Sequence, residues 1–247
     1  MRKEVLAITP ARSGSKRIPN KNIRDFLGKP LIAYTIEQGL ACPIIDRYMV
    51  DTNSPEIAKI AKKYGAEVPF LRPAHLAQDG SLYIYSLFHV LKKLKKDEGY
   101  VPTHVMILQT TSPLREMKDI MDCWEMYENT DATTVLTVCP THPKLYHLSP
   151  KNDMILVNGQ EGRSNDTQKL KPAYLQNGCF VYIINTEALL KEKLILTKKT
   201  KAVVCPKWRS VDLDSPEEWV MAELLYKNKN KIKASIKKIN KKKAVRK

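Results

Sequence analysis

The sequence predicts an α/β protein with a mainly parallel sheet and helices on both faces. Short apolar runs alternate with longer amphipathic segments, which is typical of strands joined by crossover helices. A cation-rich turn follows the first apolar run directly, as ligand-binding loops do in open parallel sheets. The alternation is interrupted only between residues 140 and 173, which predicts an insertion late in the chain.

The expected strands are Val5–Ile8, Tyr48–Asp51, His104–Gln109, Thr133–Val138, Cys179–Ile184 and Ala202–Cys205. The expected helices are Leu31–Ala41, Pro55–Tyr64, Ser81–Lys96, Met117–Asn129 and Pro216–Tyr226. Serine followed by proline marks the start of two of these helices, at Pro55 and Pro216, and glycine follows Tyr64 at the end of the first of the two.

Residues 140–173 contain several prolines and few periodic apolar positions. The sheet pattern resumes at Cys179, so this stretch is an insertion into one domain and not a linker between two. We therefore expect one domain over residues 1–226, which contains the insertion, followed by a basic tail over residues 227–247.

Composition limits the possible functions. The net charge is +16, and residues 227–247 carry eleven Lys or Arg and no acid, so the strong basicity belongs to the tail. The five cysteines lack metal-type spacing, which favours reduced, buried thiols and no structural metal. There is neither an 18-residue apolar run nor a signal peptide. We expect a cytoplasmic protein without a membrane span.

The turn Ala11–Asn22 has the composition of a polyphosphate site. It holds four cations, Arg12, Lys16, Arg17 and Lys21. Gly14 lets the main chain turn its N–H groups toward an anion without steric conflict. Its position at the carboxyl end of a strand favours binding over the alternative, a solvated basic surface.

Two carboxylates, Asp212 and Asp214, stand two residues apart at the expected end of a strand. In an extended segment that spacing points both side chains the same way, so they can converge on Mg²⁺ together with substrate phosphate oxygens. The alternative is that they cap the following helix. Ser215, Pro216 and Glu218 already form a capping box there, which leaves the aspartates available.

Six ordered motifs, spanning residues 5 to about 226, resemble those of the CMP-sialic acid synthetase family of cytidylyltransferases. They are residues 10–22, 28–32, 70–73, 109–115, 176–178 and 212–217. The resemblance implies a Rossmann-like nucleotidyltransferase fold. It also implies a reaction of CTP with a 2-keto nonulosonic acid of the sialic, legionaminic or pseudaminic type, giving CMP-sugar and pyrophosphate. A homodimer formed through the inserted arm is implied as well.

The resemblance, together with charge, assigns the site residues. Nucleotide binding falls to Ala11, Arg12, Ser15, Lys16, Lys21, Asn22 and Arg72. Sugar binding falls to Gln109 and Asn177, and catalysis to Lys16, Lys21, Asp212 and Asp214, the last two also holding Mg²⁺. One of these two carboxylates would accept the proton of the attacking hydroxyl. Arg17 can equally be solvated.

Other interpretations remain open. The family tyrosine falls at Val181, and a family arginine before Asn177 is missing, so the sugar is undetermined. Its carboxylate could meet Lys144, Arg163, Lys169 or Lys171. A CMP-Kdo-type synthetase and a metal-dependent glycosyltransferase are alternative enzymes. A non-enzymatic alternative is polyanion binding through the tail, although no specific nucleic acid is expected.

Overall fold

The structure, a computed structural model, describes residues 3–157, 170–176 and 181–244. Its central sheet has the strand order β11-β6-β10-β5-β1-β4. In chain order these strands are β1 (Val5–Pro10), β4 (Arg47–Asp51), β5 (His104–Leu108), β6 (Thr134–Thr141), β10 (Val181–Asn185) and β11 (Thr200–Val204). All adjacent pairs are parallel except those of β10, which is antiparallel to both of its neighbours. The mainly parallel sheet is confirmed.

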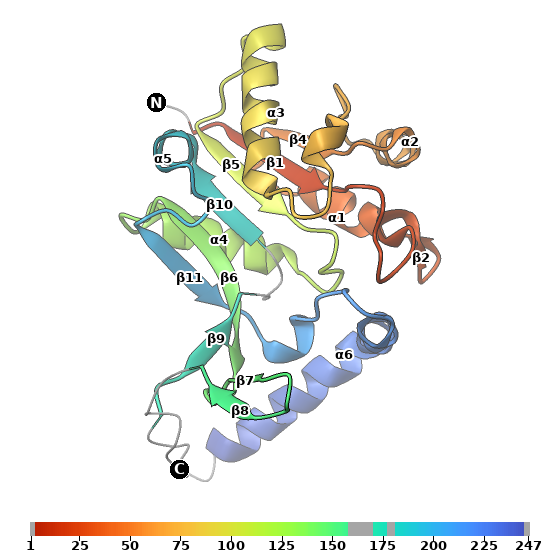
Figure 1. Cartoon of the computed structure of the whole chain (residues 1–247). Coiled ribbons are helices and arrows are strands. Elements are labelled where there is room, and N and C mark those ends of the chain that lie inside the picture. Colours follow the sequence, from red (N-terminus) through yellow and green to blue (C-terminus); the bar gives the residue numbers. More distant parts are fainter. Residues whose placement is uncertain (1–2, 158–169, 177–180, 245–247) are drawn as a thin grey trace.

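Helices cover both faces of this sheet (Figure 1). One face carries α1 (Leu31–Leu40), α2 (Pro55–Lys63) and α4 (Met117–Glu128), and the other carries α3 (Tyr83–Glu98) and α5 (Thr186–Glu192). Strand β1 shows how the sequence achieves this. Val5 and Ala7 pack on the first face while Leu6 and Ile8 pack on the second, so the whole strand is apolar and buried.

The expected strands and helices all form, and apart from the end of the last helix their ends differ by a few residues. Two features of the α-helices were not expected. Helix α5 is a seven-residue helix in a stretch for which the sequence pattern predicted none. Helix α6 was expected to end at Tyr226, but it runs from Pro216 to Ala244, so the basic tail continues a helix through the residues described. The proposed domain boundary at residue 226 therefore lies within α6.

A third apolar cluster joins the start of the chain to its last helix. Phe26, in the short strand β2 (Asp25–Phe26), is fully buried and makes edge-on ring contacts with Tyr34 of α1 and with Trp219 and Tyr226 of α6. Ile18 and Leu213 belong to the same cluster. The turn after β1 and the segment before α6 are therefore packed onto one apolar centre, although about 190 residues separate them.

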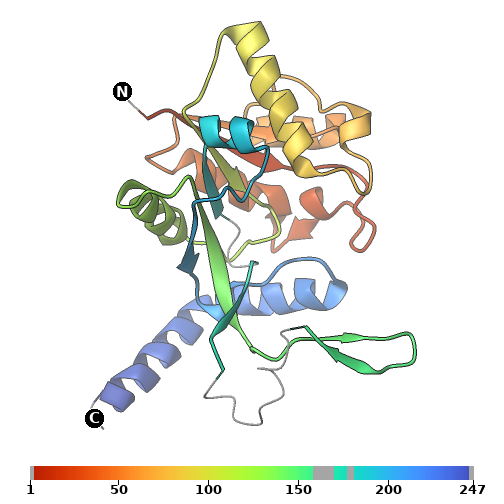
Figure 2. The same ribbon diagram turned by 60° about the vertical axis from the view of Figure 1, so that its left-hand side comes forward.

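The inserted segment extends away from the sheet (Figures 1 and 2). Strand β6 continues beyond the sheet core and pairs with β9 (Ala173–Leu175), while β7 (Tyr146–Leu148) and β8 (Met154–Leu156) form a separate hairpin. No helix in the described part of the chain is both long and apolar enough to cross a bilayer.

Candidate active site

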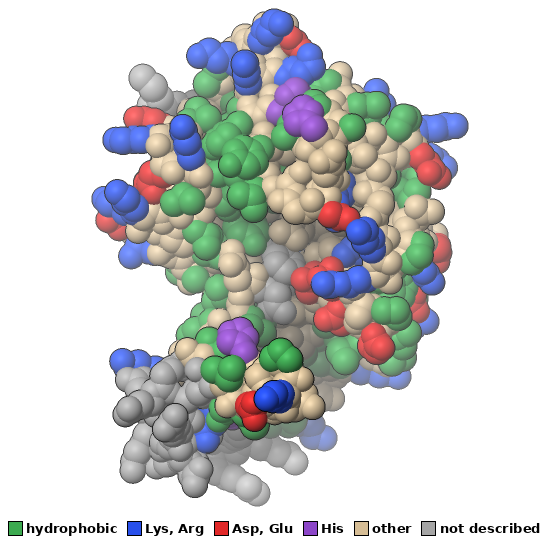
Figure 3. Space-filling model, in the orientation of Figure 1, with side chains coloured by type: hydrophobic (Ala, Val, Ile, Leu, Met, Phe, Trp, Pro, Cys, Tyr) green, Lys and Arg blue, Asp and Glu red, His purple; other side chains and the backbone are tan. Residues whose placement is uncertain are grey.

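A cleft of about 630 Å³ opens at the carboxyl ends of β1 and β5. It falls within the size range of small-molecule sites. Figure 3 shows acidic and basic side chains side by side on this face of the molecule. The sequence-predicted residues that line it are Arg12, Ser15, Lys16, Lys21, Asn22, Arg72, Gln109, Asp212 and Asp214. The structure thus brings the cationic turn and the acidic pair together.

The turn after β1 is anchored from beneath by polar side chains. Asn22, in the short helix η1 (Lys21–Ile23), is buried; its Nδ2 donates to the Arg12 carbonyl (3.0 Å), and its Oδ1 accepts from Thr110 Oγ1 (2.6 Å). Asn53 accepts from the Ser13 backbone N–H at 2.9 Å. Gly14 has φ +81°, which disfavours any side chain there. Asn22 therefore holds the shape of the turn. The cationic side chains of the turn are the groups that remain available to an anion in the cleft.

Asp79 neutralises one half of the cationic turn. Its carboxylate lies 2.9 Å from Arg12 Nη1 and 2.6 Å from Lys16 Nζ. The hydrogen bonds from Lys16 and Arg12 lower the pKa of Asp79. The local sequence around Asp79 does not indicate these pairs, because its two partners lie more than 60 residues earlier in the chain. A triphosphate that binds Arg12 and Lys16 must replace this carboxylate.

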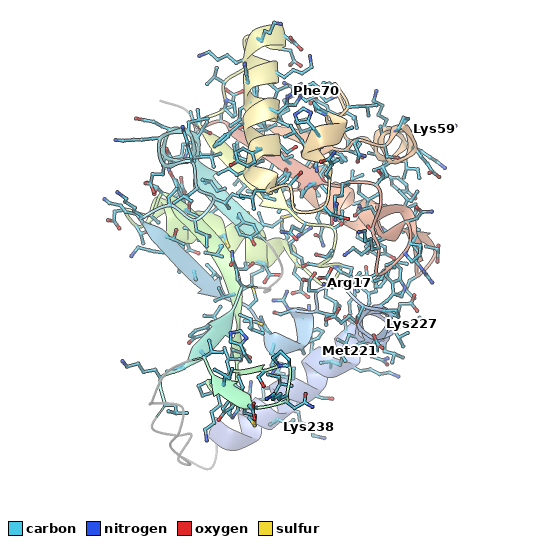
Figure 4. The ribbon with its side chains drawn as sticks, viewed as in Figure 1. Arg17, Lys59, Phe70, Met221, Lys227 and Lys238 are labelled. Carbon is cyan, nitrogen blue, oxygen red and sulfur yellow. The ribbon has the colours of Figure 1, made fainter. Side chains whose placement is uncertain are left out.

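Asp214 neutralises the other half. Lys21 Nζ and Arg17 Nη1 each lie 2.9 Å from one of its oxygens, and Lys21 Nζ also donates to the Leu213 carbonyl at 2.6 Å. Arg17 is therefore paired as well as exposed, and it points to the segment before α6 (Figure 4). Partial burial acts to raise the pKa of Asp214, but Lys21 and Arg17 together lower it.

The local geometry of the acidic pair differs from the prediction. Residues 211–214 are not a strand: the Asp214 N–H donates to the Asp212 carbonyl at 2.9 Å, which makes a tight turn around Leu213. Leu213 is completely buried in the third cluster. Both carboxylates still reach the cleft, because burying the leucine between them turns its two neighbours outward. The predicted capping box is confirmed, since Ser215 and Glu218 bond to each other's backbone N–H groups.

Asp212 is partly buried and lies in the field of the Asp214 carboxylate. Burial raises the pKa of its carboxyl, and the charge of Asp214 raises it further. A divalent cation would relieve both effects. Within the described residues no group of three or more His, Cys, Asp or Glu could hold an ion. Asp212 and Asp214 therefore fit Mg²⁺ only in the form in which substrate phosphate oxygens and water complete the coordination.

Arg72 lies at the far wall of the cleft and is held rigidly. Its Nη2 lies 2.6 Å from the Asp51 carboxylate, and Ser86 Oγ donates to that same carboxylate at 2.7 Å. The guanidinium stacks 5.4 Å from the Tyr83 ring centre. Its buried Nε atom has no partner among the described residues. Asp51, the last residue of β4, was missed by sequence analysis, since a polar residue that ends a strand resembles an ordinary loop entry.

Three remaining sugar and nucleotide assignments have different outcomes. Gln109 lines the cleft, and its carbonyl accepts from Arg115 at 3.0 Å. Ala11 is buried and does not line the cleft; its N–H donates to the Asp51 carbonyl. Asn177 lies outside the described residues, as do Arg163 and Lys169. Lys144 and Lys171 are described and do not line the cleft.

Fold and site together define an α/β class of protein in which a cationic turn and an acidic pair line one cleft at the carboxyl ends of the strands. Residues 6–203 match the family model described as "Cytidylyltransferase". The chain belongs to this cytidylyltransferase family, which confirms the resemblance found in the sequence motifs and makes it a nucleotidyltransferase.

Named relatives agree with this family. The chain is 32% identical over 225 residues to the pseudaminic acid cytidylyltransferase of Campylobacter jejuni, covering 90% of this chain and 96% of that protein. It is 33% identical over 228 residues to the CMP-N,N'-diacetyllegionaminic acid synthase of Legionella pneumophila, covering 90% and 95%. A CMP:2-keto-3-deoxy-manno-octonic acid synthetase solved with CTP is similar in fold, with TM-score 0.66, 16% identity and coverage of 92% and 100%.

Proposed function

We propose that this protein transfers the cytidylyl group of CTP to a 2-keto nonulosonic acid, releasing pyrophosphate. The observation that carries the proposal is the meeting of the cationic turn and the acidic pair, with Lys21 Nζ 2.9 Å from Asp214. The names of the relatives supply the substrate class, because they act on pseudaminic and legionaminic acids and match nearly the whole chain. The exact sugar is to be identified by assaying a panel of keto-sugar acids.

In the proposed reaction, a hydroxyl oxygen of the sugar acid attacks the α-phosphorus of CTP in line with the leaving pyrophosphate. One P–O bond forms while the bond to pyrophosphate breaks, and the hydroxyl proton passes to Asp212 or Asp214. Negative charge grows on the leaving phosphates, where Lys16 and Lys21 stabilise it more in the transition state than in the ground state. Arg72 holds the nucleoside end.

Mg²⁺ bound by Asp212 and Asp214 would neutralise charge on the phosphate oxygens. Within the chain itself, the tight turn at Leu213 fixes both carboxylates against the cleft. Glu218 accepts from the Asp214 backbone N–H at 2.9 Å, which holds that turn in place. Lys21, which pairs with Asp214 here, lines the cleft and would be available to the triphosphate.

We also propose that the inserted segment pairs two copies of the chain. Its hairpin exposes large apolar side chains: Leu148 and Met154 are each 65% exposed and Ile155 is 52% exposed. An isolated two-stranded hairpin of this kind is marginally stable in water unless something packs against it. Light scattering of the purified protein tests the homodimer, and Leu148→Ser with Met154→Ser should weaken it.

The experiment that tests the reaction is pyrophosphate release with CTP and a panel of keto-sugar acids. The panel holds sialic, legionaminic and pseudaminic acids and 3-deoxy-manno-octulosonic acid. Release that needs both CTP and one nonulosonic acid supports the proposal. Preference for the eight-carbon acid would instead indicate a Kdo-type enzyme. Turnover of nucleotide sugars without CTP would indicate a glycosyltransferase, and either result would overturn the proposal.

A further inference from the structure

Helix α6 carries one apolar stripe along most of its length. Met221, Leu225, Ile232, Ile236 and Ile239 recur at intervals of three, four or seven residues. At about 100° per residue these five positions fall within an arc of roughly 60°. Ile236 is 38% exposed and Ile239 is 55% exposed. The stripe, here called the α6 apolar stripe, therefore faces solvent at its far end.

Beyond Tyr226, lysines occupy much of the helix surface outside the stripe. Lys227, Lys231, Lys237, Lys238 and Lys241 all lie outside the stripe, and all five are exposed. No acid occurs in residues 227–247 to offset them. Figure 4 labels Lys227 and Lys238 along the helix, with Met221 near its start. An exposed apolar stripe bordered by lysines is typical of a helix that lies in a membrane interface.

The helix is fixed to the body only in its first part. The ring centres of Tyr226 and Phe26 lie 5.9 Å apart, and Lys233 forms an ion pair with Glu116. Among the described residues, Lys233 is the last that bonds to the body. Beyond it the helix extends away from the central sheet (Figure 2). Its last turns are therefore accessible to a large, flat partner.

We propose that α6 docks this enzyme on an anionic lipid surface, with the α6 apolar stripe inserted among the headgroups and the lysines around it. Charge complementarity selects this partner. A second copy of the helix would bring two lysine-rich, acid-free surfaces together, which repel each other. A nucleic acid would satisfy the lysines but not the three isoleucines, and the segment lacks the aromatic side chains that stack on bases.

The test uses the full chain in vesicle flotation. Vesicles contain phosphatidylcholine alone or phosphatidylcholine mixed with phosphatidylserine. The stripe variant is Ile232→Ser/Ile236→Ser/Ile239→Ser, and the charge variant is Lys231→Gln/Lys237→Gln/Lys238→Gln. Asn230→Ser/Ala234→Ser is the matched control, since both positions lie outside the stripe. Thermal unfolding of each variant verifies that the body remains folded; none of these residues lines the cleft.

We expect the wild type and the control to bind only the anionic vesicles, and both test variants to bind at least about tenfold more weakly. Three results would overturn the proposal. One is no binding to anionic vesicles. Another is undiminished vesicle binding by the stripe variant, which would indicate attraction to polyanions through charge alone. Binding of the same variant to duplex DNA is measured for comparison. The third is a stripe-dependent doubling of mass in solution without vesicles, which would indicate a second copy.

Discussion

Lys21 and Arg17 offer a direct test of which cation works on the triphosphate. Both lie 2.9 Å from an oxygen of Asp214, but the Lys21 side chain is 14% exposed and that of Arg17 is 73% exposed. In a partly desolvated cleft, removing one group that stabilises developing charge costs about 2.7–4 kcal/mol of transition-state stabilisation. An exposed ion pair contributes only about 0.2–1 kcal/mol.

Lys21→Met should therefore lower kcat/KM for CTP about 100- to 1,000-fold, since each 1.4 kcal/mol is a factor of about ten. Arg17→Gln, the matched control, should lower it less than about fivefold by the same conversion. The assay is pyrophosphate release at saturating sugar acid, with urea unfolding to confirm that both variants are folded. Equal losses of kcat/KM in the two variants would refute the argument that burial of the cation, and not its proximity to Asp214, decides whether it stabilises the transition state.

Two further predictions concern the site, and a third concerns a buried ion pair between Asp119 of α4 and Arg209. Asp79→Asn should release the two loop cations and lower KM for CTP roughly two- to fivefold; a higher KM would mean that Asp79 organises the loop instead. Chelation should abolish pyrophosphate release and added Mg²⁺ restore it, and Asp212→Asn should raise the required Mg²⁺ concentration at least about tenfold. Glu217→Gln, which removes a nearby exposed carboxylate, should leave that concentration unchanged. Asp119→Asn should destabilise the fold by about 3–5 kcal/mol, because it breaks a buried pair with Arg209, whereas Asp119→Leu/Arg209→Met should cost less. A double variant as unstable as the single one would contradict this account.

The buried pair of Asp119 and Arg209 also gives a pH dependence with a definite sign. Burial acts to raise the pKa of Asp119, but hydrogen bonds from Arg209 lower it below the ordinary 3.8. A carboxyl whose folded pKa is depressed contributes stability above its unfolded pKa, and that contribution is lost as pH falls through the folded value. The free energy of unfolding of the wild type, measured in urea, should fall below about pH 4. For Asp119→Asn the free energy of unfolding should fall by a smaller amount over the same pH range.

Much of the site could be predicted from the sequence because its parts are local. The turn after β1 can be recognised from its four cations and one glycine within twelve residues. The capping box at Ser215 explains why α6 begins there. The contacts between these segments could not be predicted in this way. Asp79 and Arg12 meet across 67 residues, and nothing in either local pattern indicates the other.

The sequence alone determined the layered α/β architecture, because apolar periodicity and helix caps are properties of neighbouring residues. It also indicated the family, because the six ordered motifs can be recognised directly in the amino-acid sequence. Only the tertiary structure decided how Asp212 and Asp214 face the cleft, since burial of Leu213 on Phe26 and its neighbours sets that turn. It also decided that each carboxylate of Asp79 and Asp214 shares two cations, because ion pairs depend on distances that folding alone creates.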